Sequence, residues 1–211
     1  MFLKLFFHRL FFISLVLLPT ISLDLIAPPA NAVEATAARR FVETTANEVI
    51  TLATTRMGNS VKRDHVRNLI TDKGALDDVA RVAIGRVWKT MTGVQKKRYV
   101  DAFADMLATQ MVTAFAHYSG QKLQINGTED RGKSGVFVKT WIARGAGKPP
   151  VQVDWRIIDR NGPLQLFDVY VDGVSLLMTQ RQTFSARLEK VAGNVDQFTA
   201  ILEAENKALQ R

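Results

Sequence analysis

The stretch VQVDWRII, residues 151–158, places an apolar side chain at every odd-numbered position. Polar side chains fill the even-numbered positions as far as Arg156. Because successive side chains of a strand point to opposite faces of a sheet, this period of two predicts a β-strand with one buried face. The fold therefore depends on which other segments share this period and how they connect to it.

Three other segments carry strand-like runs of this kind: QKLQING at 121–127, VFVKTWIA at 136–143 and LQLFDVYV at 164–171. The connections between the four runs are short and rich in turn-forming residues. They lie at 127–135, 144–150 and 159–162. Parallel strands would need long crossover connections, so the sequence predicts a four-stranded antiparallel meander.

Helical periodicity occupies the chain before and after these runs. The clearest helix begins at Thr92-Gly93-Val94-Gln95, whose threonine and glutamine form a capping box. Two helices follow the strands, one over roughly 175–191 and one after Asn194. We therefore predict an α+β fold in which the meander packs against N- and C-terminal helices. An apolar stripe at helical spacing marks the long helix: Tyr99, Phe103, Leu107, Met111 and Phe115.

The N-terminus is typical of a secretory signal. Lys4 and Arg9 precede an uncharged apolar run at 10–18, and Ala30-Asn31-Ala32 has the small–x–small form of a cleavage site. The alternative is an uncleaved anchor, but the run is shorter than the ~20 residues that span a bilayer. We expect residues 1–32 to be a cleaved signal peptide and residues 33–211 to form a single domain.

Composition limits the chemistry of the mature chain. Without Lys4, Arg9 and Asp24 it has 26 basic and 19 acidic residues, a net charge of +7 that favours anionic partners. The absence of cysteine excludes thiol catalysis, iron–sulfur clusters and cysteine zinc sites. His65 and His117 are isolated from each other in the sequence, so we expect no metal and no cofactor.

The segment GTEDRGKS, residues 127–134, matches the phosphate-loop pattern of nucleotide-binding proteins. A phosphate loop needs a buried parallel strand before it and a helix after it. Here the segment connects two antiparallel-reading strands, and Glu129 and Asp130 would repel a triphosphate, so we expect no nucleotide. The basic residues at 96–98 lack interleaved aromatic side chains, so we expect no nucleic acid either.

Two carboxylates keep an enzymatic alternative open. Asp154 and Asp168 lie on predicted strands, and either could act as acid or base if it pointed into a cavity. The simpler interpretation places both on the polar face of the sheet.

Two stretches resemble the MlaC family, also called the toluene-tolerance auxiliary family, of periplasmic phospholipid-binding proteins. They are ARVAIGRVWKTMTGVQKKRYVDAFADML at 80–107 and LQLFDVYVDGVSLLMTQRQTF at 164–184. A hopanoid-associated branch of the superfamily is also similar, so the resemblance implies a phospholipid or a hopanoid as the ligand. The first stretch matches the family pattern at Gly85, Trp88, Thr92, Gln95, Lys96 and Phe103, and the second at Asp168, Val169, Val171, Gly173, Val174, Ser175, Leu176, Arg181 and Phe184.

The resemblance implies a lipid cavity between the sheet and the helices, with the long helix's stripe facing the sheet. The alternative for such a stripe is plain core, as in a structural adaptor whose interior is filled. The expected lipid-binding residues are Trp88, Tyr99, Phe103, Leu107, Met111, Phe115, Phe137, Trp141, Trp155, Phe167, Val169, Val171 and Val174.

The resemblance also implies a place and partners for the protein. Family members work in the periplasm between the substrate-binding component of an inner-membrane ABC transporter and an outer-membrane lipoprotein complex. We expect a monomer without enzymatic activity. Gly173 is expected to form a turn, Ser175 to cap the next helix, and Arg181 either to approach a lipid headgroup or to pair with a carboxylate such as Asp168.

Overall fold

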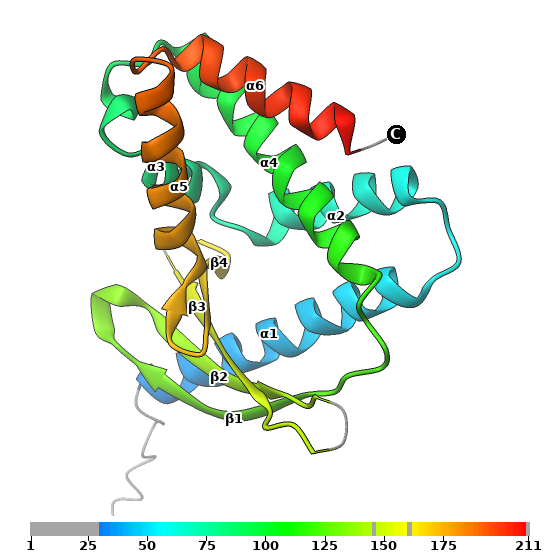
Figure 1. Cartoon of the computed structure of the whole chain (residues 1–211). Helices are drawn as coiled ribbons and strands as arrows, with labels where there is room; N and C mark the ends of the chain where they lie inside the picture. Colours follow the sequence, from blue (N-terminus) through cyan, green and yellow to red (C-terminus); the bar gives the residue numbers. More distant parts are fainter. Residues whose placement is uncertain (1–29, 145–146, 160–161, 210–211) are drawn as a thin grey trace, which may run out of the picture.

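The computed structural model describes residues 30–144, 147–159 and 162–209 (Figure 1). The predicted signal peptide, 1–32, falls almost entirely outside these residues. Within the described ranges, no helix is long and apolar enough to cross a membrane.

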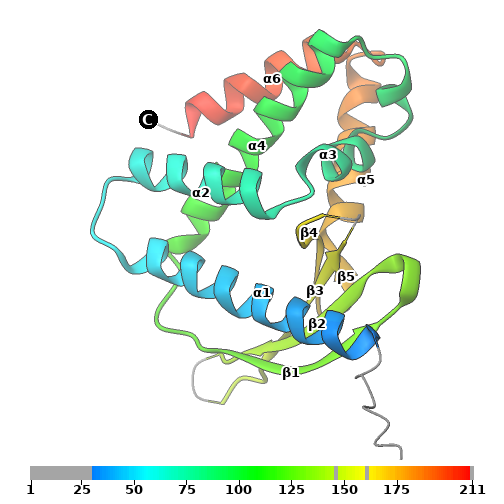
Figure 2. The ribbon, with the colours of Figure 1, turned by 180° about the vertical axis from the view of Figure 1, so that it is seen from behind.

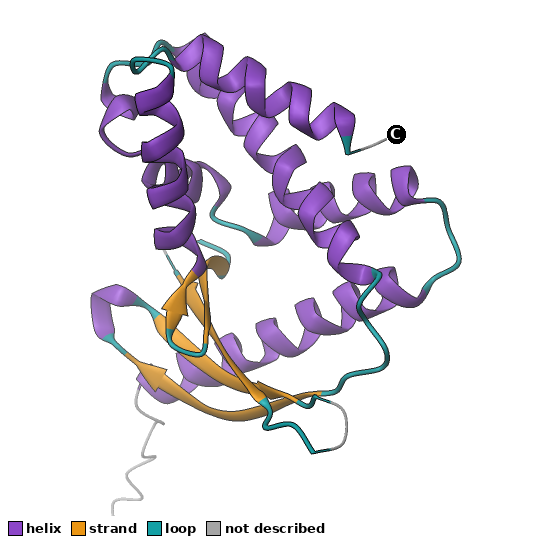
Figure 3. Cartoon of the chain, viewed as in Figure 1, coloured by secondary structure: helices purple, strands orange, loops and turns teal. Residues whose placement is uncertain are grey.

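The described chain is an α+β structure with helices before and after one antiparallel sheet (Figure 3). The sheet has the order β1-β2-β3-β4-β5, so the predicted meander is confirmed with one strand more than expected. The elements are α1 (Ala30–Thr54), α2 (Asn59–Lys73), α3 (Leu76–Ile84), η1 (Gly85–Lys89), α4 (Gly93–Phe115), β1 (Leu123–Asp130), η2 (Gly132–Ser134), β2 (Val136–Ile142), β3 (Val151–Ile158), β4 (Gln165–Val171), β5 (Val174–Ser175), α5 (Leu176–Lys190) and α6 (Val195–Ala208).

The extra strand β5 results from a tight turn. Asp172 and Gly173 both have positive φ, 48° and 82°, which is the backbone geometry that two-residue hairpin turns require. The chain therefore reverses and pairs Val174 with Val171 before α5 begins. Ser175 then caps α5 as predicted, because its side chain accepts a hydrogen bond from the Met178 N–H.

The helix α1 lies across one face of the sheet, over β1 and β2 (Figure 2). Its buried side chains Ala38 and Val42 pack against three buried residues of the sheet, Val136, Val138 and Ile157. The start of α5 lies on the opposite face, since Asp168, which points away from α1, accepts a hydrogen bond from the Leu177 N–H. The sheet therefore separates α1 from α5.

The helical core contains the first half of the predicted stripe. Tyr99 and Phe103 are 0% and 1% exposed, and both rings contact Phe184 of α5. Tyr99 also contacts Phe198 of α6. Burial raises the pKa of the Tyr99 hydroxyl, which donates to the Ala80 carbonyl at 3.1 Å. The prediction that this stripe faces the sheet is wrong for its first half, because α4 packs chiefly between α2 and α6.

The predicted capping box of α4 is confirmed. The Thr92 side chain accepts from the Gln95 N–H at 3.2 Å, and the Gln95 side chain accepts from the Thr92 N–H at 2.9 Å. Gln95 also donates to Asp196 of α6 at 2.8 Å. The cap therefore sets both the start of α4 and its contact with α6.

The phosphate-loop pattern lies in a β-hairpin connection. Its first half belongs to β1 and its second half to the single turn η2, after which β2 pairs antiparallel with β1. This is the setting that the sequence predicted for the segment. At its end, Gly135 has φ +88°, and a Cβ there would lie 2.2 Å from the Ile157 carbonyl oxygen.

We expect Gly135→Ala to lower the free energy of unfolding by roughly 2–4 kcal/mol, because the methyl group meets rigid backbone at a positive φ. Gly132→Ala is the matched control: its φ is +57° but nothing lies within 4 Å of the added carbon. It should cost about 1 kcal/mol. Urea denaturation of both variants measures the difference, and equal losses would contradict this account of Gly135.

Candidate functional site

An apolar strip on the α1-facing side of the sheet is the candidate site. We define the strip as Trp155, Val169, Val171 and Val174. Trp155 pairs with Val169, and Val171 pairs with both Val153 and Val174, so their side chains share one face. The first three are half-buried and Val174 is 59% exposed.

The helix α1 covers this strip only in part: Trp155 packs against the cluster that contains Ala38 and Val42 of α1, whereas Val174 is exposed. The helix crosses β1 and β2, whereas β4 and β5 lie beside it (Figure 2). Phe41 of α1 and Leu166 of β4 are also half-buried on the apolar cluster of this face. Apolar side chains that a protein leaves unsealed in one area commonly mark a binding surface. The strip thus keeps part of its apolar surface accessible at the end nearer Val174.

A hydrogen bond fixes the aromatic ring of the strip. Trp155 Nε1 donates to Thr140 Oγ1 at 3.0 Å, and that hydroxyl donates to the Val153 carbonyl at 2.7 Å. Thr140 is fully buried. Thr140 was not among the predicted site residues, although its position two residues after Val138 on the apolar face of a strand marks it as an inward-facing polar group.

Three other predicted residues of the sheet lie elsewhere. Phe137 and Trp141 point to the face opposite the strip, as the register with Arg156 and Gln152 shows. Phe137 is 4% exposed, with the Arg131 guanidinium 4.0 Å from its ring centre. Trp141 is 44% exposed. Phe167 sits at an irregularity between β3 and β4 and packs against the helical core.

The predicted residues of the helices form two further groups. Trp88, Tyr99, Phe103 and Leu107 belong to the helical core, while Met111 and Phe115 pack with Val66 of α2. The structure therefore brings four of the thirteen predicted residues together on the strip and places the other nine away from it.

The two candidate catalytic carboxylates have structural environments. Asp168 is 6% exposed and accepts from Ser175 Oγ at 2.6 Å and from the N–H groups of Val169 and Leu177 at 2.8 and 3.0 Å. Asp154 accepts from the Gln152 side chain at 3.0 and 3.1 Å. Asp168 thus joins β4 to the start of α5.

The expected pairing of Arg181 with Asp168 is wrong. The Arg181 guanidinium lies beside Gly85 and donates to the Val82 carbonyl at 3.4 Å. Over the ranges that the structure describes, no carboxylate lies within ion-pair distance of it. Asp168 is instead occupied by hydroxyl and backbone donors.

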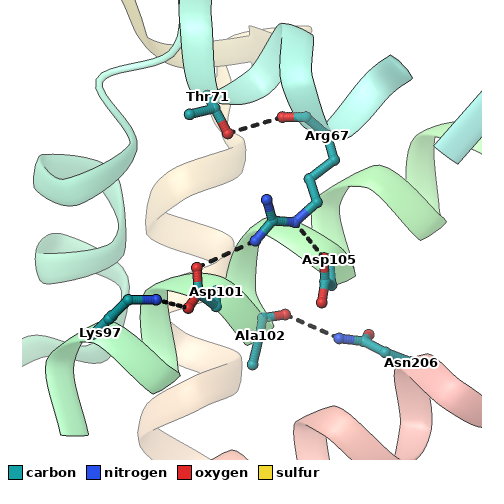
Figure 4. Close-up of polar contacts among 7 residues, drawn as sticks. All are labelled: Arg67, Thr71, Lys97, Asp101, Ala102, Asp105 and Asn206. Atoms are coloured by element: carbon teal, nitrogen blue, oxygen red, sulfur yellow. Dashed lines mark hydrogen bonds and ion pairs between the residues drawn. The ribbon is translucent and has the colours of Figure 1, made fainter. Parts of the chain in front are cut away.

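A hollow of about 770 Å³ lies between α2, α3 and α4, apart from the strip. Its charges are largely paired with one another: Arg67 donates to Asp105 at 2.6 Å and to Asp101 at 3.2 Å, and Asp101 accepts from Lys97 at 2.6 Å (Figure 4). The two carboxylates raise the pKa of Arg67. Leu76, Trp88 and Val100 add apolar side chains, so the lining of this hollow mixes charged groups with apolar surface.

Charged side chains also pair with one another on the face of the sheet opposite α1. Arg131 and Lys139 lower the pKa of the Glu129 carboxyl to about 2 by donating to it.

In the described part of the chain, no group of three histidine, cysteine or acidic side chains is placed to hold a metal ion.

The comparisons with known proteins assign the chain to a family. The family model described as MlaC protein matches residues 43–204, which include every residue of the strip. The chain belongs to the MlaC family. The family's matched region also includes the helical core, the whole sheet, α5 and most of α6.

Two known proteins are similar to this MlaC-family chain. The intermembrane phospholipid transport system binding protein MlaC of Haemophilus influenzae is 24% identical over 118 residues, or 54% of this chain and 55% of the relative. The match therefore spans about half the length of that relative. A phospholipid-binding protein from Ralstonia solanacearum, solved in complex with a phospholipid, has the same fold, with a TM-score of 0.70 and 20% identity over 82% of this chain and 99% of that one.

We expect Asp168→Asn to destabilise the protein by about 1.5–3 kcal/mol, because hydrogen bonds to a charged group are lost or weakened in a buried site. Asp154→Asn makes the same change on the same face of the neighbouring strand, and it should change the free energy of unfolding by no more than about 0.5 kcal/mol. Thermal unfolding monitored by circular dichroism compares the two. If Asp168→Asn leaves the stability unchanged, the carboxylate does not hold α5 in place.

Proposed function

We propose that this MlaC-family chain is a periplasmic lipid carrier that binds phospholipid acyl chains on the apolar strip. It would move lipid between the substrate-binding component of an inner-membrane ABC transporter and an outer-membrane lipoprotein complex, without catalysis. The observation that carries the proposal is the strip itself, an apolar face that α1 covers only in part in a fold shared with a protein solved with phospholipid.

The physical need for such a surface follows from the cost of exposing acyl chains to water. Each methylene group that leaves an apolar environment costs about 0.8 kcal/mol, so two free acyl chains cost tens of kcal/mol. A carrier lowers this cost by replacing water with its own apolar side chains. Trp155 contributes the largest such surface on the strip, and the three valines continue it towards the sheet edge.

The structure gives the enzymatic alternative less support than the sequence did. Both oxygens of Asp168 accept hydrogen bonds that hold β4, β5 and α5 together. Asp154 lies on the face opposite the strip, since its register partner on β4 is Tyr170. Neither carboxylate therefore faces the surface on which we place the lipid.

Native mass spectrometry of the chain, exported to the periplasm and purified without detergent, tests the proposal. We expect a mass excess equal to one lipid, and extraction of the same sample should identify a phospholipid or a hopanoid. The observed N-terminus also tests cleavage after Ala32. A lipid-free mass for folded protein would contradict the carrier function.

We expect Val171→Asn to weaken lipid retention about thirtyfold, because it places a polar amide against acyl chains at a cost of roughly 2 kcal/mol. Val61→Asn is the control: Val61 is 47% exposed on α2, away from the strip. Lipid occupancy from native mass spectra compares the two variants. If Val61→Asn loses as much lipid as Val171→Asn, the strip is not the binding surface.

A further inference from the structure

One corner of the molecule carries an excess of positive charge that the lipid site does not use. The segment 79–100, from α3 to the first turns of α4, contains six basic residues and no acidic residue. Its charged side chains do not line the apolar strip. The backbone of this segment meets the end of α5 and the start of α6 at one corner of the fold (Figure 1). Val87, Met91, Val191 and Val195 pack in one cluster there and hold these segments together.

We define the basic corner as Arg86, Lys89, Lys97 and Lys190 with the apolar side chain of Val94. Arg86, Lys89 and Lys190 are exposed, and within the described parts of the chain they have no hydrogen-bond or ion-pair partner. Lys97 contacts Asp101 but keeps 80% of its side chain exposed. Most of this charge is therefore available to an anionic partner.

The neighbouring charges leave the corner positive. Arg98 is neutralised by Glu203 at 2.7 Å, and Asp196 is held by Gln95 at 2.8 Å. Glu189 is the other acidic residue at the end of α5. The basic side chains of the corner thus exceed the acidic ones that face it.

The corner also exposes an apolar tip. Val94 is 80% exposed at the start of α4, beside Gly93. It is the one large apolar side chain exposed at this corner among the residues that the structure describes. A specific protein partner would bury about 800 Å² on each side around several apolar anchors, which a single valine does not supply. Docking on a bilayer surface requires neither a large buried interface nor several apolar anchors.

From this combination we infer that the basic corner docks on an anionic phospholipid bilayer, with Val94 at the headgroup level and the basic side chains on the lipid phosphates. A lysine or arginine near an anionic bilayer surface strengthens binding about fivefold. Four such residues give weak, reversible and salt-sensitive attachment. The proposal concerns a surface separate from the apolar strip, so it does not depend on lipid being held there.

Sedimentation with vesicles tests this docking surface. We expect the purified protein to pellet with vesicles of phosphatidylcholine mixed with phosphatidylglycerol, to stay in solution with phosphatidylcholine alone, and to be released by high salt. The double variant Arg86→Glu/Lys89→Glu should bind the anionic vesicles at least tenfold more weakly. Circular dichroism should show that it remains folded.

The control variant Lys133→Glu/Lys148→Glu changes the net charge equally but lies on the connections around β2, away from the corner. It should keep most of the binding. Equal loss in both double variants would show that only net charge matters, and binding that survives reversal at the corner would overturn the proposal, as would no binding by the unmodified protein. Val171→Asn should still bind these vesicles, so failure of the lipid-carrier function and failure of the docking surface give different results.

Discussion

The carboxylate of Asp168 connects the two halves of the structure. It accepts a hydroxyl and two backbone N–H groups, and two of these donors, Ser175 and Leu177, belong to the turn that starts α5. The helix α5 then supplies Phe184 to the aromatic cluster with Tyr99 and Phe103. A buried anion with three donors is stable, whereas the same site with an unpaired charge is not. Asp168 therefore links the sheet to the start of α5, and through α5 to the helical core.

This division explains why the molecule has a filled core and an unsealed face at the same time. On the helical side, the aromatic cluster is closed by α4, α5 and α6, and its members are almost fully buried. On the other side, α1 covers β1 and β2 and leaves the strip on β3 to β5 partly open. Stability is supplied by the first region, so the second can stay incompletely packed without unfolding the chain.

Sequence patterns predicted where the helices and strands lie better than they predicted which elements pack against one another. The capping box at Thr92 and the caps at Ser175 and Asn194 are local hydrogen-bond motifs, and all three are present. Helical spacing showed that Tyr99 and Phe103 share a face, but spacing does not say which element that face meets. The prediction therefore aimed the stripe at the sheet instead of at α5 and α6.

The same limit applies to the sheet. Alternation groups Phe137 with Trp141 and Trp155 with Ile157, but it does not relate the faces of different strands to each other. Register does, and it shifts at irregularities between Arg156 and Ile157 and between Ile125 and Gly127. The strip could therefore be recognised only after the strands were placed side by side.

The hydrogen bond between Trp155 and Thr140 has a consequence for the thermodynamics of ligand entry. The indole ring of Trp155 is held in one orientation before any ligand arrives, because Thr140 is itself anchored to the Val153 carbonyl. Ordering of that ring belongs to folding and not to binding, so a ligand meets a preorganised surface and loses less affinity to side-chain entropy. For the lipid binding that we propose, the ring of Trp155 is therefore a fixed element to which a flexible acyl chain adapts its own shape.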